Sequence, residues 1–170
     1  MISTKYKNWI ATLDLFTCFF CRSSHGQIYR MDEFVMNEPP VHPNCRCIVE
    51  PMKARLPGTA TQLKEDGADW WLRETGKLPD YYISEIEARK LGYRGRKGNL
   101  NRVAPGKMLT KGVYYNDDGH LPSSPGRIWF EADINYNPLF FYRGPDRILF
   151  SNDGLIFVTY DHYHTFEEII

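Results

Sequence analysis

Four features are missing from this sequence, and each absence narrows its function. It carries no net charge, with 21 Lys or Arg against 21 Asp or Glu, so global electrostatics do not draw it to nucleic acid. It has no apolar run long enough to span a membrane. Lys5, Lys7 and Asp14 interrupt the N-terminal region and no small-residue cleavage site follows, which excludes an N-terminal signal peptide on this chain. Cysteine is absent beyond residue 47.

The composition supports a real core, because 42% of the residues are hydrophobic and 15% are aromatic. The length of 170 residues fits one domain or slightly more. Two prolines, a glycine and small polar residues between residues 51 and 61 are typical of a linker. We therefore predict a Cys-rich segment at residues 1–52, a linker at 53–65 and a second domain at 66–170.

The four cysteines form two close groups with metal-ligand spacing. Two residues separate Cys18 from Cys21, and Cys45 and Cys47 follow His42. Four thiols and a histidine suit a tetrahedral zinc site, and His42 could replace one thiol. Disulfides between the two groups are the alternative, because Cys45 and Cys47 cannot readily bridge each other.

The second domain reads as helices followed by strands. Residues 68–75 are predicted to form a helix that buries Trp70, Trp71 and Leu72 and stops at Gly76. Ser84 and Glu87 form a capping box for a second helix that ends at Gly92, and a helical turn is expected near residues 99–104. Four or five strands follow, which predicts an α+β fold with an antiparallel sheet.

Three of the predicted strands carry reactive side chains among apolar neighbours. These strands are residues 129–136, 146–150 and 161–166, rich in aromatic and β-branched residues. A carboxylate (Glu131), an imidazole (His162) and two arginines (Arg143, Arg147) are what acid–base chemistry on a phosphodiester needs. Taken alone, Glu131 could equally face solvent, and His162 with His164 could bind a metal.

A basic stretch precedes these strands. From Arg89 to Lys111 the sequence has eight Lys or Arg and no Asp or Glu. Such a stretch can follow a phosphate backbone, or it can simply form a solvated surface.

The region from about residue 69 to 170 resembles the barnase family of small bacterial endoribonucleases. The similarity rests on six motifs in the family's order and nearly its spacing, with a small insertion at residues 138–142. The motifs are Leu78-Pro79-Asp80, Lys97-Gly98-Asn99-Leu100, Val103-Ala104-Pro105-Gly106-Lys107, Gly126-Arg127-Ile128-Trp129, residues Glu131 to Tyr136, and Asp161-His162-Tyr163. Co-linear matches over about a hundred residues are far more specific than one short motif.

The resemblance implies metal-independent cleavage of single-stranded RNA to a 2′,3′-cyclic phosphate. It assigns Glu131 as general base and His162 as general acid, with Arg143 and Arg147 on the phosphate. It makes Asp133 the residue that orients the arginines. No cofactor is expected for catalysis.

The resemblance also implies a guanine-binding loop. Tyr114 and Tyr163 would lie at the base-stacking site. Tyr115, Asn116 and Asp117 would offer backbone N–H groups, and Asp118 would accept from the guanine ring. The same residues read without the resemblance form an ordinary turn between strands.

Two residues depart from the family pattern. Glu85 stands where the family has a lysine near the scissile phosphate, and Asp117 replaces an arginine of the guanine loop. We expect Arg89 or Arg94 to supply the missing charge; the alternative is a slow or inactive member.

Residues 5–51 resemble the C-terminal end of the minor head proteins of tailed phages, the Mu F-like group. The similarity lies in Trp9 to Cys21 and in Pro39-Pro40-x-His42-Pro43-Asn44-Cys45-Arg46-Cys47. Such modules precede toxin domains in prophage polymorphic toxins. The two resemblances together imply a ribonuclease toxin of bacterial or prophage origin that acts in the target-cell cytoplasm and is restrained by an immunity protein. A phage head or delivery particle is the carrier that they imply.

Two other functions remain open. The chain could be a phage head-associated structural protein with an inactive, RNA-binding domain, or a zinc-dependent nucleic-acid-binding protein without catalysis.

Overall fold

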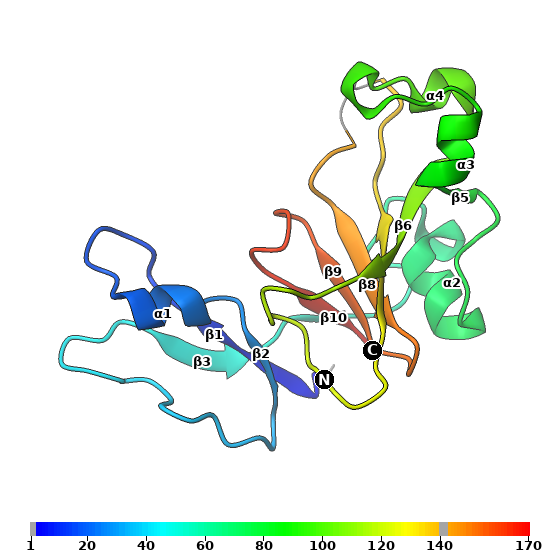
Figure 1. Cartoon of the computed structure of the whole chain (residues 1–170). Helices are drawn as coiled ribbons and strands as arrows, with labels where there is room; N and C mark the ends of the chain where they lie inside the picture. The colour runs from blue at the N-terminus through cyan, green and yellow to red at the C-terminus, as the bar shows by residue number, and fades with distance from the viewer. Residues whose placement is uncertain (1–2, 140–142) are drawn as a thin grey trace.

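The computed structural model describes residues 3–139 and 143–170 and contains two sheets (Figure 1). The small sheet has the order β2-β1-β3, from β1 (Tyr6–Ile10), β2 (Ile28–Arg30) and β3 (Ile48–Pro51), with α1 (Phe19–Ser24) beside it. The large sheet has the order β4-β10-β9-β8-β7-β6-β5. Its strands are β4 (Ala54–Arg55), β5 (Tyr82–Ser84), β6 (Met108–Tyr114), β7 (Trp129–Asp133), β8 (Arg147–Ser151), β9 (Ile156–Thr159) and β10 (Glu167–Ile169).

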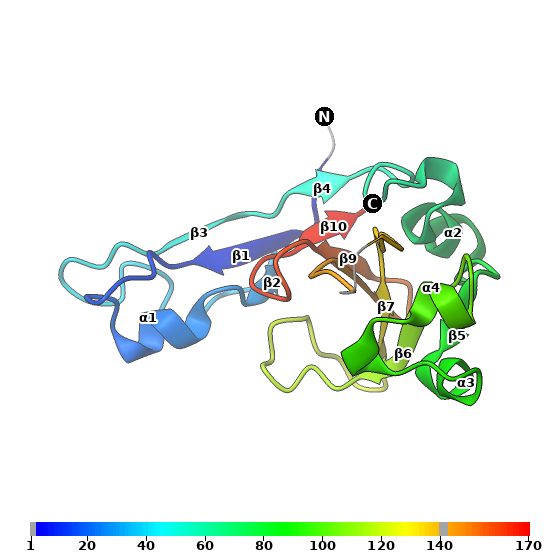
Figure 2. The same cartoon turned by 90° about the horizontal axis from the view of Figure 1, so that it is seen from above.

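The helices of the second domain lie on the side of the large sheet away from the small sheet (Figures 1 and 2). They are α2 (Ala68–Thr75), α3 (Glu85–Lys90) and α4 (Leu100–Val103), with 3-10 turns at Lys64–Asp66 and Gly95–Lys97. The α+β prediction is confirmed. The five inner strands are antiparallel. The short edge strands were not predicted; β4 pairs in parallel with β10, and β5 pairs in parallel with β6. Within the described residues no helix could cross a bilayer.

The predicted helix limits agree with the structure. Gly76 ends α2 in the left-handed conformation at φ 71°, and Ser84 and Glu87 form the capping box of α3. The burial prediction for α2 was partly wrong. Leu72 is buried, but Trp70 and Trp71 are half-buried, and Ala68 and Asp69 point into the protein instead. The chain buries an aspartate there because Asp69 accepts hydrogen bonds from the Ala60 amide and the Thr61 hydroxyl.

The two faces of the large sheet bury different partners. On one face, Ala132, Ile148 and Val158 pack with Ala68 and Leu72 of α2. On the other face, a core cluster joins the two parts of the chain and contains Tyr6, Ile28, Met52, Leu121, Trp129, Leu149, Phe157 and Phe166. Alternation along β7 places Glu131 and Asp133 on this second face with Trp129.

The segment 53–65, predicted as a linker, contributes to the sheet. Its strand β4 pairs with β10, and Ala60 is buried in the α2 core. The small sheet is held to the second domain by further hydrogen bonds, from the Ile28 amide to the His120 carbonyl and from the Thr4 hydroxyl to Glu168. The domain limits themselves stay a prediction.

Candidate active site

Glu131 lies in the middle of the central strand β7, and only 4% of its surface is exposed. Its Oε1 accepts a hydrogen bond from the Tyr163 hydroxyl at 2.7 Å. Two cations face the same oxygen, Lys111 Nζ at 3.2 Å and Arg147 Nε at 3.4 Å. A buried carboxylate persists only with such partners, so Glu131 is not the solvent-facing residue that its sequence context alone allowed.

Asp133 fixes the arginines. It is 1% exposed, and its two oxygens receive Arg143 Nη2 at 2.5 Å and Nε at 2.6 Å in a bidentate pair. Arg147 Nε is 3.2 Å from Asp133 Oδ1, since β7 and β8 pair these two residues directly. Three cations thus surround two carboxylates in this cluster. Its positive excess would attract a phosphodiester.

Lys111 was not among the residues predicted from the sequence. It sits on β6 where the pairing with β7 shifts register, so that Thr110 pairs with Ala132 and Gly112 with Glu131. This β-bulge leaves Lys111 as the extra residue and turns it toward Glu131. Gly112 adopts φ 77°, which other residues rarely do. Gly112 itself was the signal available in the sequence, because a glycine inside a strand often marks a bulge.

His162 lies in a loop, which corrects the predicted strand at residues 161–166. Residues 160–166 connect β9 to β10, and His162 and Tyr163 adopt φ 57° and 72°, which no strand allows. Asp161 holds this β9–β10 loop by accepting hydrogen bonds from Thr159, Thr165 and the His164 amide. In the described residues 160–166, His162 and His164 are therefore not placed on one face of a strand, as the alternative metal site would require.

Tyr163 connects the two proposed catalytic groups. Its hydroxyl donates to Glu131, and the exposed His162 ring packs on the Tyr163 ring at 4.6 Å between centroids. Burial and the Glu131 carboxylate raise the pKa of Tyr163, so the hydroxyl stays protonated as a donor. The Tyr163 ring also stacks on the Tyr114 ring, with 5.6 Å between the ring centroids.

The predicted base-binding residues follow β6. Asn116 adopts φ 51° and braces the loop with two hydrogen bonds to the Leu121 backbone. Tyr115 is 81% exposed, and Asp117 and Asp118 are also exposed. The structure therefore brings Tyr114 to Tyr163 beside Glu131, and leaves the Asp118 carboxylate free to face solvent.

Arg89 does not face the carboxylate cluster as a free charge. It pairs with Glu85 one helical turn earlier, with Nη2 at 2.5 Å and Nε at 3.0 Å from Oε1. The negative charge of Glu85, which departs from the family pattern, is thus neutralised by Arg89 on the surface of α3.

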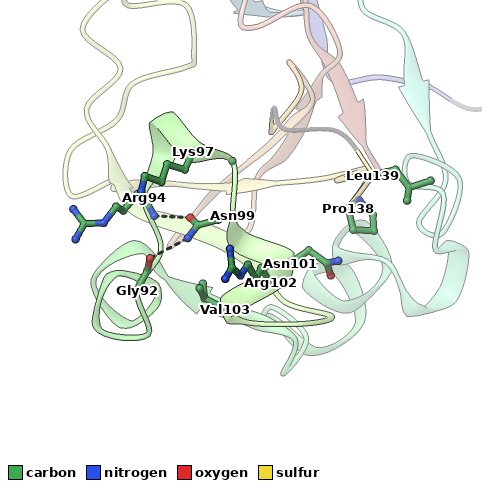
Figure 3. A pocket seen from close by; sticks show the side chains of 10 residues that line it. Gly92, Arg94, Lys97, Asn99, Asn101, Arg102, Val103, Pro138 and Leu139 are labelled. Atoms are coloured by element: carbon green, nitrogen blue, oxygen red, sulfur yellow. Dashed lines mark hydrogen bonds between the residues drawn. The ribbon is translucent and has the colours of Figure 1, made fainter.

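The basic stretch surrounds an open cavity of about 770 Å³ (Figure 3). Arg94, Lys97 and Arg102 line it, together with Asn101 and the segment at Pro138 and Leu139. Asn99 shapes its rim, because its side chain accepts from the Arg94 amide at 2.7 Å and donates to the Gly92 carbonyl at 3.1 Å. The described residues that line this cavity include three cations and no carboxylate.

The cysteines and His42 come together in the small domain. All four thiols are free, and two triads of donors share Cys21: Cys18, Cys21 and His42, and Cys21, Cys45 and Cys47. Cys21 Sγ is 3.8 Å from Cys45 Sγ and 3.4 Å from His42 Nε2. A tetrahedral zinc site with Zn–S near 2.3 Å implies edges of about 3.5–3.8 Å, so these donors fit zinc.

Two of the thiols and a carbonyl beside His42 also suit this fit, whereas burial raises the pKa of Cys21. The hydrogen bond from the Cys21 amide lowers the pKa of Cys18. Burial opposes ionisation of Cys45, but backbone N–H groups outweigh it and lower its pKa to about 7. His42 Nδ1 is 2.9 Å from the Pro43 carbonyl, which favours a proton there and leaves Nε2 free as a ligand.

Comparison with known proteins decides the family. The family model for ribonuclease matches residues 69–170. The chain belongs to the ribonuclease family. A ribonuclease from Heyndrickxia coagulans is 48% identical over 104 residues, which cover 61% of this chain and 94% of that protein. Ribonucleases from Bacillus intermedius and Bacillus pumilus are each 48% identical to this chain over 104 residues, which cover 63% of each of those proteins.

The family membership indicates an endoribonuclease with an RNA substrate. A second family model, the Phage Mu protein F like protein, matches residues 2–50. The cysteine and histidine donors all lie within this phage-related module. Both resemblances seen in the sequence are therefore confirmed.

Proposed function

We propose that this chain is a metal-independent endoribonuclease that cuts single-stranded RNA after purines, preferentially guanine. The observation that carries the proposal is the buried Glu131 carboxylate, held at one oxygen by Lys111, Arg147 and Tyr163. A buried charge arranged beside arginines and an exposed histidine is typical of a site for acid–base catalysis on a charged substrate.

The reaction uses the nucleophile that RNA carries. Glu131 takes the proton of the 2′-hydroxyl, the 2′-oxygen bonds to phosphorus, and the bond from phosphorus to the 5′-oxygen breaks. His162 gives its proton to the leaving 5′-oxygen. Arg143 and Arg147 stabilise the phosphorane charge, and Asp133 keeps both arginines in position. The product is a 2′,3′-cyclic phosphate.

Base recognition is assigned to the loop after β6. Tyr114 and Tyr163 already form a stacked pair beside Glu131, and a guanine could extend this stack. Asn116 holds the loop so that backbone N–H groups of residues 115–117 face the base, and Asp118 accepts from the ring. Because Asp118 is short and Asp117 is negative, we expect a modest preference for guanine over adenine.

The phage-related module is proposed to bind structural zinc through Cys18, Cys21, Cys45 and Cys47, and His42 is the alternative to one of these thiols. When bound, zinc would fix the chain around α1. This metal takes no part in RNA cleavage. Tyr114 and Tyr163 of the proposed RNA site pack against the core cluster around Trp129, whereas the cysteines belong to a different cluster.

The biological role follows from the combination of the two families. We infer a prophage-derived toxin whose module serves delivery, with the target-cell cytoplasm as its place of action. An active ribonuclease needs restraint in the cell that makes it, so we expect an immunity protein that matches the positive cluster around Asp133 and Glu131.

One observation favours a second function. Glu85 places a negative charge where a phosphate-binding lysine is expected, and Arg89 is engaged with it. An inactive, RNA-binding domain in a phage head-associated protein would tolerate this change.

The test is cleavage of a guanosine-containing RNA by the whole chain in excess EDTA, with products analysed by mass spectrometry. We expect ends with a 2′,3′-cyclic phosphate, mostly after G. A folded chain that binds the RNA without cutting it would support the second function. Cleavage that stops in EDTA and returns with a divalent metal would contradict the proposed chemistry.

A further inference from the structure

The cation closest to the proposed base comes from the bulge in β6. Lys111 Nζ is 3.2 Å from Glu131 Oε1, and the Lys111 side chain is 37% exposed. The Thr110 hydroxyl donates to the Glu131 carbonyl at 2.9 Å and fixes the bulge against β7. Lys111 thus reaches from solvent to a buried carboxylate, at the edge where a substrate phosphate would enter.

The position of Lys111 is related to that of Glu85 by the pairing of β5 with β6. These strands are parallel, and Ser84 pairs with Thr110. Glu85 and Lys111 directly follow these two paired residues in the sequence. The resemblance expects a lysine at position 85, where this chain has a carboxylate paired with Arg89. Relative to the family pattern, the protein therefore lacks a cation at position 85 and has one at position 111, which is adjacent to it across the paired strands.

We propose that Lys111 is a catalytic residue that binds a non-bridging oxygen of the scissile phosphate, in the role of the lysine lost at position 85. This inference rests on the proposed function. In the resting enzyme, Lys111 is paired with the Glu131 carboxylate. When Glu131 accepts the 2′-hydroxyl proton it becomes neutral, and Lys111 loses its counter-ion as negative charge develops on the phosphorane oxygens.

The interaction is therefore stronger in the transition state than with bound substrate. Such an interaction raises kcat and has little effect on KM. Removing one charge-stabilising donor of this kind typically costs about a hundredfold or more in kcat. A lysine that only held the fold of β6 would not produce this pattern.

The experiment measures kcat and KM for guanylyl-3′,5′-adenosine with Lys111→Met and Lys111→Arg. We expect kcat to fall by about a hundredfold in Lys111→Met, with KM within about threefold of the parent. Lys111→Arg should keep most of the rate, because the cation remains. Lys77→Met is the matched control, since Lys77 is exposed and lies outside the site; its rate should be unchanged.

A second variant separates binding of the phosphate from support of Glu131. Glu85→Lys in the Lys111→Met background restores a cation at the neighbouring position but not the contact with Glu131. We expect it to recover at least about tenfold in kcat. Circular dichroism shows whether each variant is folded. If Lys111→Met is unfolded, the rates of Lys111→Arg and of the double variant test the role of Lys111.

Three results would overturn the inference. They are a Lys111→Met rate within threefold of the parent, a loss that appears only in KM, and a double variant as slow as Lys111→Met. A parent chain that cleaves nothing would overturn the proposed function itself. The parent rate, measured first, therefore distinguishes the two failures.

Discussion

Asp133→Asn should destabilise the protein strongly, because Asp133 is the buried anion that two arginines share. Its side chain is 1% exposed, and it pairs with Arg143 at 2.5 Å and with Arg147 at 3.2 Å. Removing one partner of a buried ion pair leaves uncompensated charge and costs about 3–5 kcal/mol. This is a large part of the 5–15 kcal/mol by which a typical domain is stable.

The matched control is Asp153→Asn. Asp153 also forms a pair with an arginine, Arg127, but its side chain is 45% exposed. A pair whose carboxylate is solvated contributes about 1 kcal/mol or less. Arg127, whose side chain is 13% exposed, keeps the Pro122 carbonyl as a partner when Asp153 is replaced. Both substitutions remove one negative charge and keep the side-chain shape, so the comparison isolates burial.

The assay is urea unfolding followed by tryptophan fluorescence, in which the buried Trp129 on β7 reports on the central strand. We expect the free energy of unfolding to fall by at least about 2 kcal/mol more in Asp133→Asn than in Asp153→Asn. Equal losses in the two variants would refute the reasoning, because they would show that the Asp133 cluster behaves like a surface pair.

Three further predictions concern the loop, the metal and the basic surface. Burial of Asp161 disfavours its charge, but hydrogen bonds from Thr165, Thr159 and His164 outweigh burial and hold its pKa below the usual value. Its contribution to stability is thus present above the unfolded-state pKa near 4 and is lost as pH falls through the lower folded-state value. Asp161→Asn should narrow the gap in thermal stability between pH 6 and pH 3, and a parent-like gap in thermal melts would contradict this. Cys21→Ser should abolish the thiolate-to-metal absorption of the Co²⁺-loaded chain, because Cys21 belongs to both donor triads, whereas His42→Ala should keep it; loss in both would contradict the four-thiol assignment. Replacing Arg94, Lys97 and Arg102 with Ala in a Glu131→Gln background should reduce the slope of log affinity for single-stranded RNA against log salt by about 2. A control triple variant at Lys5, Lys64 and Lys77 should leave that slope unchanged, and equal slopes for the two triple variants would contradict the assignment.

Local signals predicted much of the fold. The capping box at Ser84 and Glu87 and the stop at Gly76 depend on neighbouring residues, so sequence places them well. The aromatic and β-branched residues of β7 and β8 also predicted these two strands of the inner sheet. The loop at Asp161 to Phe166 was read as a strand because it is aromatic-rich, and its positive φ values depend on the Asp161 hydrogen bonds instead.

The residues of the site also divide into those that the sequence could place and those that it could not. Glu131, Asp133 and Arg147 could be placed together because they share one face of adjacent strands. Lys111 could not, because its direction is set by a bulge that only the pairing of β6 with β7 defines. The union of the small sheet with the second domain through Tyr6, Ile28 and Phe157 was also out of reach, since it depends on contacts between distant segments.

The central claim is that Glu131 and His162 act as base and acid on RNA without a metal. The most direct measurement compares the parent with Glu131→Gln and His162→Gln on a fluorescent guanosine-containing RNA in excess EDTA. We expect cleavage by the parent and a loss of about a hundredfold or more in each variant. Cleavage by either folded variant at the rate of the parent would contradict the account.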